Sequence, residues 1–403
     1  MYKIFVLGVA DALFSAAQEK ILARCSLVVG TKRFLALTTH LPGRRLPITP
    51  LPAALDASRT ALQQGNVAVL ASGDPLFYGI GRRLLAEFPA DIIEFYPALS
   101  SIQRACALFK IPWDDAVITS LHGRTSSHIP GLLLRNPKNL ILTDKDNSPE
   151  LIAGRLLDYL QLIGEPVLPD AITMLVAEDL GSENERIFRG TLLEVSKQNF
   201  SPLNVTCLLV PDTADMSSSP FGLSEDAIRH SRGLITKNEV RAATLHQLQL
   251  PRQGVFWDVG AGSGSLSIEA ARMNQELTVF AVEHKQEELE NIKNNIVKFG
   301  CYNIVPVFGR APEVLGSLPD PDRIFVGGSS GSLPAIAELA AKRLSGDGRL
   351  VINGVIEKTV REAPALMIRF GFAVASSVIN VTRTEPDGRI FDFNPITIMT
   401  GTR

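Results

Sequence analysis

Short apolar runs alternate with amphipathic stretches up to about residue 165. Runs rich in Val, Ile and Leu are followed by helix-like segments, an order that predicts α/β architecture with largely parallel strands. The stretch from 172 to 210 is strand-rich and predicts a second layer that contains a hairpin. We expect strands at residues 4–7, 27–30, 67–71, 92–96, 116–121, 140–143, 172–177, 186–195 and 205–210, and helices at 12–24, 78–87, 100–109 and 149–162.

A polar segment interrupts this pattern at residues 211–222, which read Pro-Asp-Thr-Ala-Asp-Met-Ser-Ser-Ser-Pro-Phe-Gly. Segments rich in Pro, Ser and Gly commonly connect domains. A chain of 403 residues also exceeds the length at which single cores stop growing. We therefore predict two domains, residues 1–210 and 223–403, joined by a linker at 211–222.

The alternation of strands and helices resumes after the linker and predicts a Rossmann-like, mostly parallel sheet. At its start, Thr236 and Glu239 have the spacing of a capping box, which predicts Thr236 as a helix N-cap. At its end, a turn at Pro386-Asp387-Gly388 predicts a β-hairpin that closes the sheet. We expect strands at 255–259, 278–282, 304–308, 323–326 and 349–352, and β-rich segments at 373–384 and 395–400.

The most informative stretch of the second half is Phe-Trp-Asp-Val-Gly-Ala-Gly-Ser-Gly at residues 256–264. An apolar strand ends in an acid and passes into a glycine loop and a helix, whose first N–H groups would point at a ligand. A second acid closes the next strand, where a carboxylate can accept both ribose hydroxyls of an adenosine. The glycine spacing departs from G-x-G-x-x-G, so we favour S-adenosylmethionine over NAD or a plain turn. The residues are Asp258, Gly260, Gly262, Gly264 and Glu283.

Three other loops follow predicted strands and carry candidate chemistry. Gly73-Asp74-Pro75 lies at the carboxyl end of an apolar strand, where ligands bind in open α/β sheets, although such a sequence is also a common turn. His122-Gly123-Arg124 is also compatible with solvated loop side chains. Gly309-Arg310-Ala311-Pro312 is also compatible with an ordinary helix start.

Composition narrows the class of protein. The net charge of -2 offers no global basic field for nucleic acid or an anionic membrane. The four cysteines form no C-x-x-C pair and are expected to be reduced core thiols, so we predict no metal site. Six histidines do not assemble a hydrolytic triad by spacing. A start without a charged leader and the lack of a long apolar run predict a cytoplasmic enzyme with no membrane partner.

The motifs of the two halves resemble two methyltransferase families. The first half is similar to the tetrapyrrole methylase family at residues 29–33, 71–81, 97–101, 120–124, 178–181 and 202–204. The second half resembles the class I S-adenosylmethionine-dependent methyltransferases at residues 236–241, 258–264, 283, 309–312 and 327–328. In this order the chain looks like the fused C-methyltransferases of corrin-ring (cobalamin) biosynthesis. The chain departs from the family at Gly8-Val9-Ala10-Asp11-Ala12, where the tetrapyrrole methylases have a G-x-G-P-G loop. Only Gly8 matches, so it is the one residue of this loop to which the resemblance assigns a role.

The resemblance implies a bifunctional methyltransferase with one S-adenosylmethionine in each domain. The first, a tetrapyrrole methylase domain of two α/β subdomains with a cofactor cleft between them, would methylate C5 of a precorrin-6 or cobalt-precorrin-6 type intermediate. The second would methylate C15 and decarboxylate the C12 acetate. The implied cofactor-binding residues are Gly8, Gly73, Asp74, Leu76, Ser100, Ser101, Leu180 and Asn204 in the first domain, and Thr236, Asp258, Gly260, Gly262, Gly264, Glu283, Gly309, Arg310 and Ala311 in the second.

The implied substrate is a polyanionic tetrapyrrole, a small molecule whose carboxylates Arg and Lys can hold. The candidates for this clamp are His122, Arg124, Lys237, Arg241 and Arg310. A sulfonium methyl donor is already activated, so orientation is the main task and we assign no catalytic acid or base. We also expect a homo-oligomer. The alternatives are methylation of RNA or protein by the second half, or a nucleotide-binding module that holds NAD without turnover.

Overall fold

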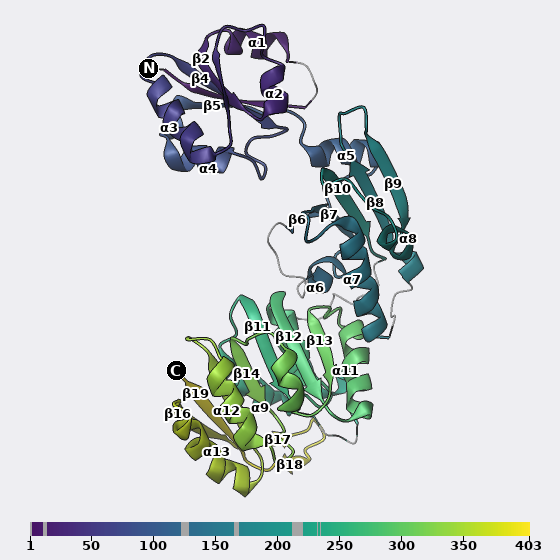
Figure 1. The fold of residues 1–403 in the computed structure, drawn as a ribbon. Coiled ribbons are helices and arrows are strands. Elements are labelled where there is room, and N and C mark those ends of the chain that lie inside the picture. The colour runs from purple at the N-terminus through teal and green to yellow at the C-terminus, as the bar shows by residue number, and fades with distance from the viewer. Residues whose placement is uncertain are drawn as a thin grey trace.

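The computed structural model describes residues 2–10, 14–121, 129–164, 169–211, 221–231, 233 and 235–403. These residues form three α/β units that follow one another along the chain (Figure 1). The first two units together correspond to the predicted first domain, and the third corresponds to the predicted second domain. Most of the predicted linker, residues 212–220, lies outside the described residues.

The first unit is a five-stranded parallel sheet in the order β3-β2-β4-β1-β5. Its central strands are apolar and buried, as expected where helices cover both faces of a parallel sheet. The strand order reverses beside β1, and ligands bind at the carboxyl ends of the strands at such a point. The elements are β1 (Ile4–Val9), α1 (Ala16–Leu22), β2 (Cys25–Gly30), α2 (Lys32–Ala36), β3 (Arg44–Pro47), α3 (Leu51–Ala61), β4 (Asn66–Ser72), α4 (Gly81–Glu87), η1 (Ala90–Ile92) and β5 (Ile93–Tyr96).

The second unit is a mixed sheet in the order β6-β7-β10-β8-β9, in which only the β6–β7 pair is parallel. The β8–β9 hairpin confirms the expected strand-rich layer. The predicted strand at 186–195 was too long, because the chain turns into a helix after Thr191. The elements are α5 (Ser101–Phe109), β6 (Val117–Ser120), α6 (Ile129–Leu133), β7 (Lys138–Leu142), α7 (Pro149–Leu162), η3 (Pro169–Ala171), β8 (Thr173–Glu178), β9 (Arg186–Thr191), α8 (Leu192–Ser196) and β10 (Asn204–Leu209).

The third unit is a seven-stranded sheet in the order β13-β12-β11-β14-β15-β19-β16. Its first five strands are parallel and only β19 runs antiparallel to its neighbours. The order reverses between β11 and β14, which makes the carboxyl end of β11 the expected ligand site. The elements are η4 (Glu225–Ala227), α9 (Asn238–Leu248), β11 (Gln253–Val259), α10 (Ser265–Met273), β12 (Glu276–Glu283), α11 (Gln286–Lys298), β13 (Ile304–Phe308), η5 (Glu313–Ser317), β14 (Arg323–Val326), α12 (Leu333–Arg343), β15 (Arg349–Gly354), α13 (Glu357–Arg369), β16 (Ala373–Ile379) and β19 (Ile396–Thr402).

The predicted closing hairpin is divided between two sheets. Strands β16 and β19 close the main sheet as an antiparallel pair. The turn at residues 386–388 instead joins β17 (Thr382–Thr384) and β18 (Ile390–Asp392), which form a separate two-stranded sheet. We call residues 381–393 the β17–β18 arm.

The second and third units share one buried hydrophobic cluster. The Tyr159 hydroxyl of α7 donates to the Ile304 carbonyl of β13 over 2.7 Å, and Arg135 donates to the Gln275 carbonyl over 3.1 Å. Gln275 and Ile304 lie at the amino ends of β12 and β13. The second unit therefore contacts the edge of the third sheet that is opposite to the expected ligand site.

Candidate functional site

The glycine loop after β11 has the tight turn that the sequence predicts. Gly260, Gly262 and Gly264 have φ angles of +70°, +55° and +75°, a region that L side chains rarely adopt. A Cβ on Gly260 would also clash with the backbone of Gly328 after β14. The loop therefore places its backbone at the switch point of the sheet, close to any ligand there.

Asp258 lies at the end of β11 and is fully buried. Its Oδ2 accepts a hydrogen bond from the Ser267 hydroxyl over 2.5 Å, whereas its Oδ1 is buried with no hydrogen-bond partner. Burial raises the pKa of this carboxyl from 3.8 to about 7, against the smaller lowering effect of the Ser267 hydrogen bond. A carboxylate oxygen left unpaired beside a cavity fits a cationic ligand group, such as the ammonium of S-adenosylmethionine.

Glu283 ends β12 beside the same loop. Its Oε2 accepts from the Gly262 amide over 2.9 Å, and its Oε1 accepts from the amides of His284 and Lys285 over 2.8 and 2.9 Å. These backbone bonds fix the carboxylate. Oε1 already accepts from two amides and lies 3.0 Å from His284 Nδ1, whereas Oε2 accepts one bond and keeps lone-pair capacity for a further donor. The predicted contact to a ribose would therefore be made through Oε2.

Two cavities meet at the glycine loop. The larger, of about 530 Å³, lies on the Asp258 side and is mainly apolar, with walls that include Ile235, Val240 and Phe325. The smaller, of about 320 Å³, lies on the Glu283 side. The acid of β11 therefore faces one compartment and the acid of β12 faces another, with the glycines between them.

Gly309, Arg310 and Ala311 follow β13 and line a small cavity of about 20 Å³ next to the loop, together with His284. The Gly309 amide donates to the Glu283 carbonyl over 3.0 Å, so this turn is tied to the end of β12. Arg310 is exposed. The structure thus brings the three predicted residues to the Glu283 side of the glycine loop.

Thr236 and Lys237 line the larger cavity, but Thr236 is not the N-cap that the sequence predicts. Helix α9 begins at Asn238 after Lys237, and no side chain caps it. The Lys237 Nζ donates to Glu225 over 2.8 Å and the side chain stays 30% exposed. A lysine in this position is available to a carboxylate in the cavity.

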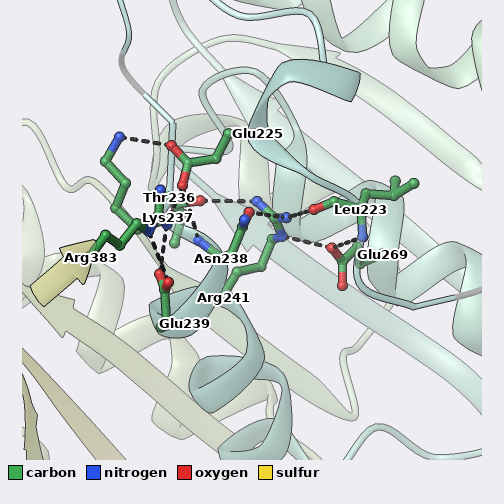
Figure 2. A network of polar contacts seen from close by, with 9 residues as sticks. All are labelled: Leu223, Glu225, Thr236, Lys237, Asn238, Glu239, Arg241, Glu269 and Arg383. Atoms are coloured by element: carbon green, nitrogen blue, oxygen red, sulfur yellow. Dashed lines mark hydrogen bonds and ion pairs between the residues drawn. The ribbon is translucent and has the colours of Figure 1, made fainter. Parts of the chain in front are cut away.

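Arg241, which the sequence analysis treats as a clamp candidate, is corrected by the structure. Its side chain is 1% exposed, and its Nε donates to Glu269 over 2.8 Å. Nη1 and Nη2 donate to the backbone carbonyls of Thr236 and Leu223 (Figure 2). Arg241 therefore holds the segment before α9 in place and has no face for a substrate.

Three residues predicted for the first domain, Gly8, Gly73 and Ser100, come together at the carboxyl ends of β1 and β4. A Cβ on Gly8 would clash with the Gly73 carbonyl and with the Ala98 amide. A Cβ on Gly73 would lie 2.9 Å from the Ser100 Cα. Ser100 caps α5 through the Gln103 amide. These backbone segments are close enough that no side chain fits between them.

The remaining residues predicted for this site lie around that contact. Asp74 accepts from the Leu76 amide over 2.9 Å, and Leu76 and Ser101 are exposed. Leu180 precedes Gly181, whose Cβ would lie 3.3 Å from the Ala10 carbonyl of the loop after β1. Asn204, the first residue of β10, pairs with Glu178 at the end of β8, just before the loop that contains Leu180. His122 and Arg124 lie outside the described residues.

Sequence reasoning missed several residues of the third-unit site, and two of them are polar or aromatic side chains at the ends of elements far apart in the chain. Phe393 and Asn353 line the larger cavity, from the end of the β17–β18 arm and from the end of β15. Neither residue has a local motif, because both reach the cavity only through the tertiary fold. Their position at or near the ends of strands is the one signal that the sequence contained.

The cysteines lie in the core of the described residues. All four cysteines are free and buried, as predicted, and burial raises the pKa of Cys207 and Cys301 to about 12. In the part of the chain that the structure describes, no helix is long and apolar enough to cross a bilayer. The same residues contain no cluster of three His, Cys, Asp or Glu side chains suited to a metal ion.

Two family models match the chain. Residues 8–196 match the tetrapyrrole (corrin/porphyrin) methylases. Residues 227–401 match the precorrin methyltransferase domain. The two matches lie on either side of the predicted linker. They cover the two glycine cradles, which we define as the backbone turns at Gly8 and Gly73 in the first unit and at residues 260–264 in the third.

Curated relatives match the whole chain or its second half. A precorrin-6Y C(5,15)-methyltransferase [decarboxylating] from Sinorhizobium sp is 31% identical over 382 residues, which cover 94% of this chain and 89% of that protein. A probable cobalt-precorrin-6B C(15)-methyltransferase (decarboxylating) from Pyrobaculum calidifontis is 38% identical over 185 residues, 44% of this chain and 94% of that protein.

A solved structure described as precorrin-6y C5,15-methyltransferase from Geobacter metallireducens is 37% identical, covers 46% of this chain and 98% of its own, and has a TM-score of 0.45. The full-length likeness to the Sinorhizobium protein settles the family. The chain belongs to the decarboxylating precorrin-6Y C5,15-methyltransferases, S-adenosylmethionine-dependent enzymes of cobalamin biosynthesis.

Proposed function

We propose that this chain methylates C5 and C15 of a precorrin-6 or cobalt-precorrin-6 type tetrapyrrole and removes the carboxylate of its C12 acetate. Two S-adenosylmethionine molecules would serve the two methylations, one in the cleft of the first two units and one in the third unit. The observation that carries this proposal is the presence of two unlike glycine cradles, each at the switch point of its own sheet.

In the third unit, Asp258 would accept a hydrogen bond from the cofactor's ammonium, and Glu283 would accept through Oε2 from a ribose hydroxyl. Gly309 to Ala311 would border the adenine. When bound, the cofactor supplies a methyl group on a positively charged sulfur. The task of the protein is to hold a ring carbon in line with that methyl group, and orientation alone accounts for about 7 kcal/mol or more of barrier reduction in well-aligned systems.

The larger cavity has the character expected for the substrate side of this reaction. Its apolar walls suit a conjugated ring, and Lys237 offers a cation to one of the peripheral carboxylates. The acetate side chain loses carbon dioxide and takes up one proton to become a methyl group. Apolar surroundings disfavour the charged carboxylate relative to neutral carbon dioxide, so the lining itself promotes this step.

The first two units would methylate C5. Gly8, Gly73 and Ser100 bring three backbone segments together, and a cofactor would lie against them at the carboxyl ends of β1 and β4. Exposed Leu76, which follows Gly73 and Asp74 in the loop after β4, would offer apolar surface to a tetrapyrrole.

Calorimetric titration with S-adenosylmethionine tests the cofactor count. We expect two equivalents per chain for the wild type and one for Glu283→Ala. The matched control is Glu290→Ala, because Glu290 lies one turn into α11, is exposed and bonds only to neighbours on its own helix. A wild type that binds a single equivalent contradicts one cofactor per methyltransferase region.

Mass spectrometry of the product tests the reaction. Incubation with the tetrapyrrole substrate and excess cofactor should add two methyl groups and remove one carbon dioxide. The Glu283→Ala variant should still add one methyl group and should leave the acetate intact. Loss of carbon dioxide in that variant would contradict the assignment of decarboxylation to the third unit.

A further inference from the structure

The β17–β18 arm forms one wall of the larger cavity. Val381 and Phe393, at the two ends of the arm, both line it. The Phe393 amide donates to the Val381 carbonyl over 3.0 Å, which continues the hairpin pairing up to the cavity. The position of the Phe393 ring therefore depends on where this two-stranded arm lies.

The Arg383 side chain ties the arm to two segments of the third unit that lie far from it in the sequence. Arg383 of β17 donates through Nε and Nη2 to the two carboxylate oxygens of Glu239 on α9, over 2.9 and 2.7 Å. Its Nη2 also donates to Glu225 over 2.5 Å (Figure 2). Such two-pronged pairs fix direction as well as distance. Arg383 thereby joins segments that are 144 and 158 residues apart in the chain.

Two cations of this ion-pair cluster, Lys237 and Arg383, lie close to the Phe393 ring. The Lys237 Nζ and the Arg383 Cζ each lie 5.1 Å from the ring centroid, within the range of cation–π attraction. Lys237 and Phe393 line the cavity, whereas Arg383 is not among the residues that line it. Arg383 can thus influence a ligand in the cavity through Phe393, and not by touching it.

Arg383 keeps the Glu239 carboxylate charged to a lower pH than an ordinary glutamate. The Arg383 hydrogen bond is the main reason that the pKa of Glu239 lies below its usual value. The two cations and the two carboxylates of this cluster also neutralise one another, so the arm stays in place without a polyanionic substrate. The wall is therefore preorganised, and substrate binding does not have to order it.

We propose that Arg383 is a positioning residue that fixes Phe393 as the platform on which the substrate's conjugated ring lies, with Lys237 beside it for a peripheral carboxylate. The β17–β18 arm is then the part of the third unit that selects a large, flat, anionic substrate. This inference rests on the proposed function, because it assigns the larger cavity to the tetrapyrrole.

Two disruptive variants, one conservative variant (Arg383→Lys) and one control test the inference in the full chain. Arg383→Met removes the ion pairs that join the arm to Glu225 and Glu239, and it keeps much of the side-chain length. Phe393→Leu removes the platform and leaves the ion pairs intact. Arg389→Met is the control, because Arg389 lies on the same arm, its side chain is 70% exposed, and it contacts only residues of the arm itself, Asp387 in the turn and the ring of Phe391, among the contacts described.

We expect Arg383→Met and Phe393→Leu to raise the KM for the tetrapyrrole in C15 methylation by about tenfold, the effect of losing one good aromatic contact. The dissociation constant for S-adenosylmethionine and C5 methylation should stay as in the wild type, which also shows that both variants fold. Arg383→Lys, which can keep one ion pair, should recover part of the loss. Arg389→Met should behave as the wild type.

Equal KM values for the wild type and Phe393→Leu would overturn the platform. A normal KM in Arg383→Met together with a raised KM in Phe393→Leu would overturn the positioning role of Arg383. If Arg383→Met does not fold, Phe393→Leu still decides whether the arm contacts substrate. A wild type that binds cofactor but never methylates C15 would instead contradict the proposed function.

Discussion

Cofactor binding by the third unit should release a proton from Asp258. Without a ligand, this buried carboxyl has a pKa of about 7, chiefly because burial disfavours its charged form. An ammonium beside the unpaired Oδ1 would stabilise the carboxylate and lower that pKa. Binding of S-adenosylmethionine below pH 7 should therefore be coupled to deprotonation of Asp258. The perturbations are pH and the isosteric substitution Asp258→Asn.

The size of the effect follows from the pKa. If the bound carboxylate is fully charged, binding releases about 0.9 proton at pH 6 and about 0.5 at pH 7. The affinity should rise about fivefold between these two values, a range in which the cofactor's own amine is still mostly protonated. The pH dependence of folding stability has the opposite sign, because stability falls where cofactor affinity rises. Since the folded pKa lies above the 3.8 of an ordinary Asp, the carboxyl favours the cofactor-free fold at acid pH, and this contribution is lost as pH rises through about 7.

Calorimetry in two buffers of different ionisation enthalpy, both at pH 6, counts the protons released per chain. The wild type should release nearly one more proton than Asp258→Asn, whose amide cannot titrate. The Asn variant should also bind the cofactor of the third unit more weakly. Equal proton release by the two proteins would refute the assignment of the ammonium to Asp258.

Three further results are expected. Tyr159→Phe leaves the Ile304 carbonyl on the edge strand β13 without its buried donor, so the free energy of unfolding measured in urea should fall by about 1–3 kcal/mol, and an unchanged midpoint would contradict this. Gly8→Ala pushes a Cβ into the Gly73 carbonyl, so titration should find one cofactor equivalent fewer. A mixture of Gly8→Ala with Glu283→Ala should form the doubly methylated, decarboxylated product that neither variant forms alone; no such product would show that the intermediate does not pass between chains.

The same four-residue pattern was overlooked at one position of the chain and wrongly assigned as a capping box at another. Thr191 and Glu194 form a capping box, which starts a helix inside the predicted strand at 186–195. Thr236 and Glu239 have the same spacing but form none, because Glu239 is bound by Arg383. A capping box is a local device, so a distant arginine that takes its acid can cancel it. The sequence contains no local sign of that arginine.

The glycine loop was predictable for the converse reason. The glycines, the preceding Asp258 and the later Glu283 lie on consecutive strands of one parallel sheet, so their order in the chain sets their order in space. Arg241 shows the limit of such reasoning. Its place near the loop indicated a substrate contact, but the fold supplies Glu269 as a buried partner, and burial was not visible in the sequence.

The arrangement of the units bears on how the two methylations are connected. The third unit contacts the second through the amino ends of β12 and β13, whereas its glycine loop lies at the carboxyl ends. Strand β12 has eight residues, so at about 3.3 Å per residue it keeps the loop roughly 23 Å from that contact. In the second unit, α6, the residues before β7 and Tyr159 of α7 make the contact, while the loop after β8 faces Ala10 of the first unit at the carboxyl end of β8. Under the proposed function, the two sites therefore lie on opposite sides of the contact between the second and third units, and a tetrapyrrole methylated at one would have to leave it before it reaches the other.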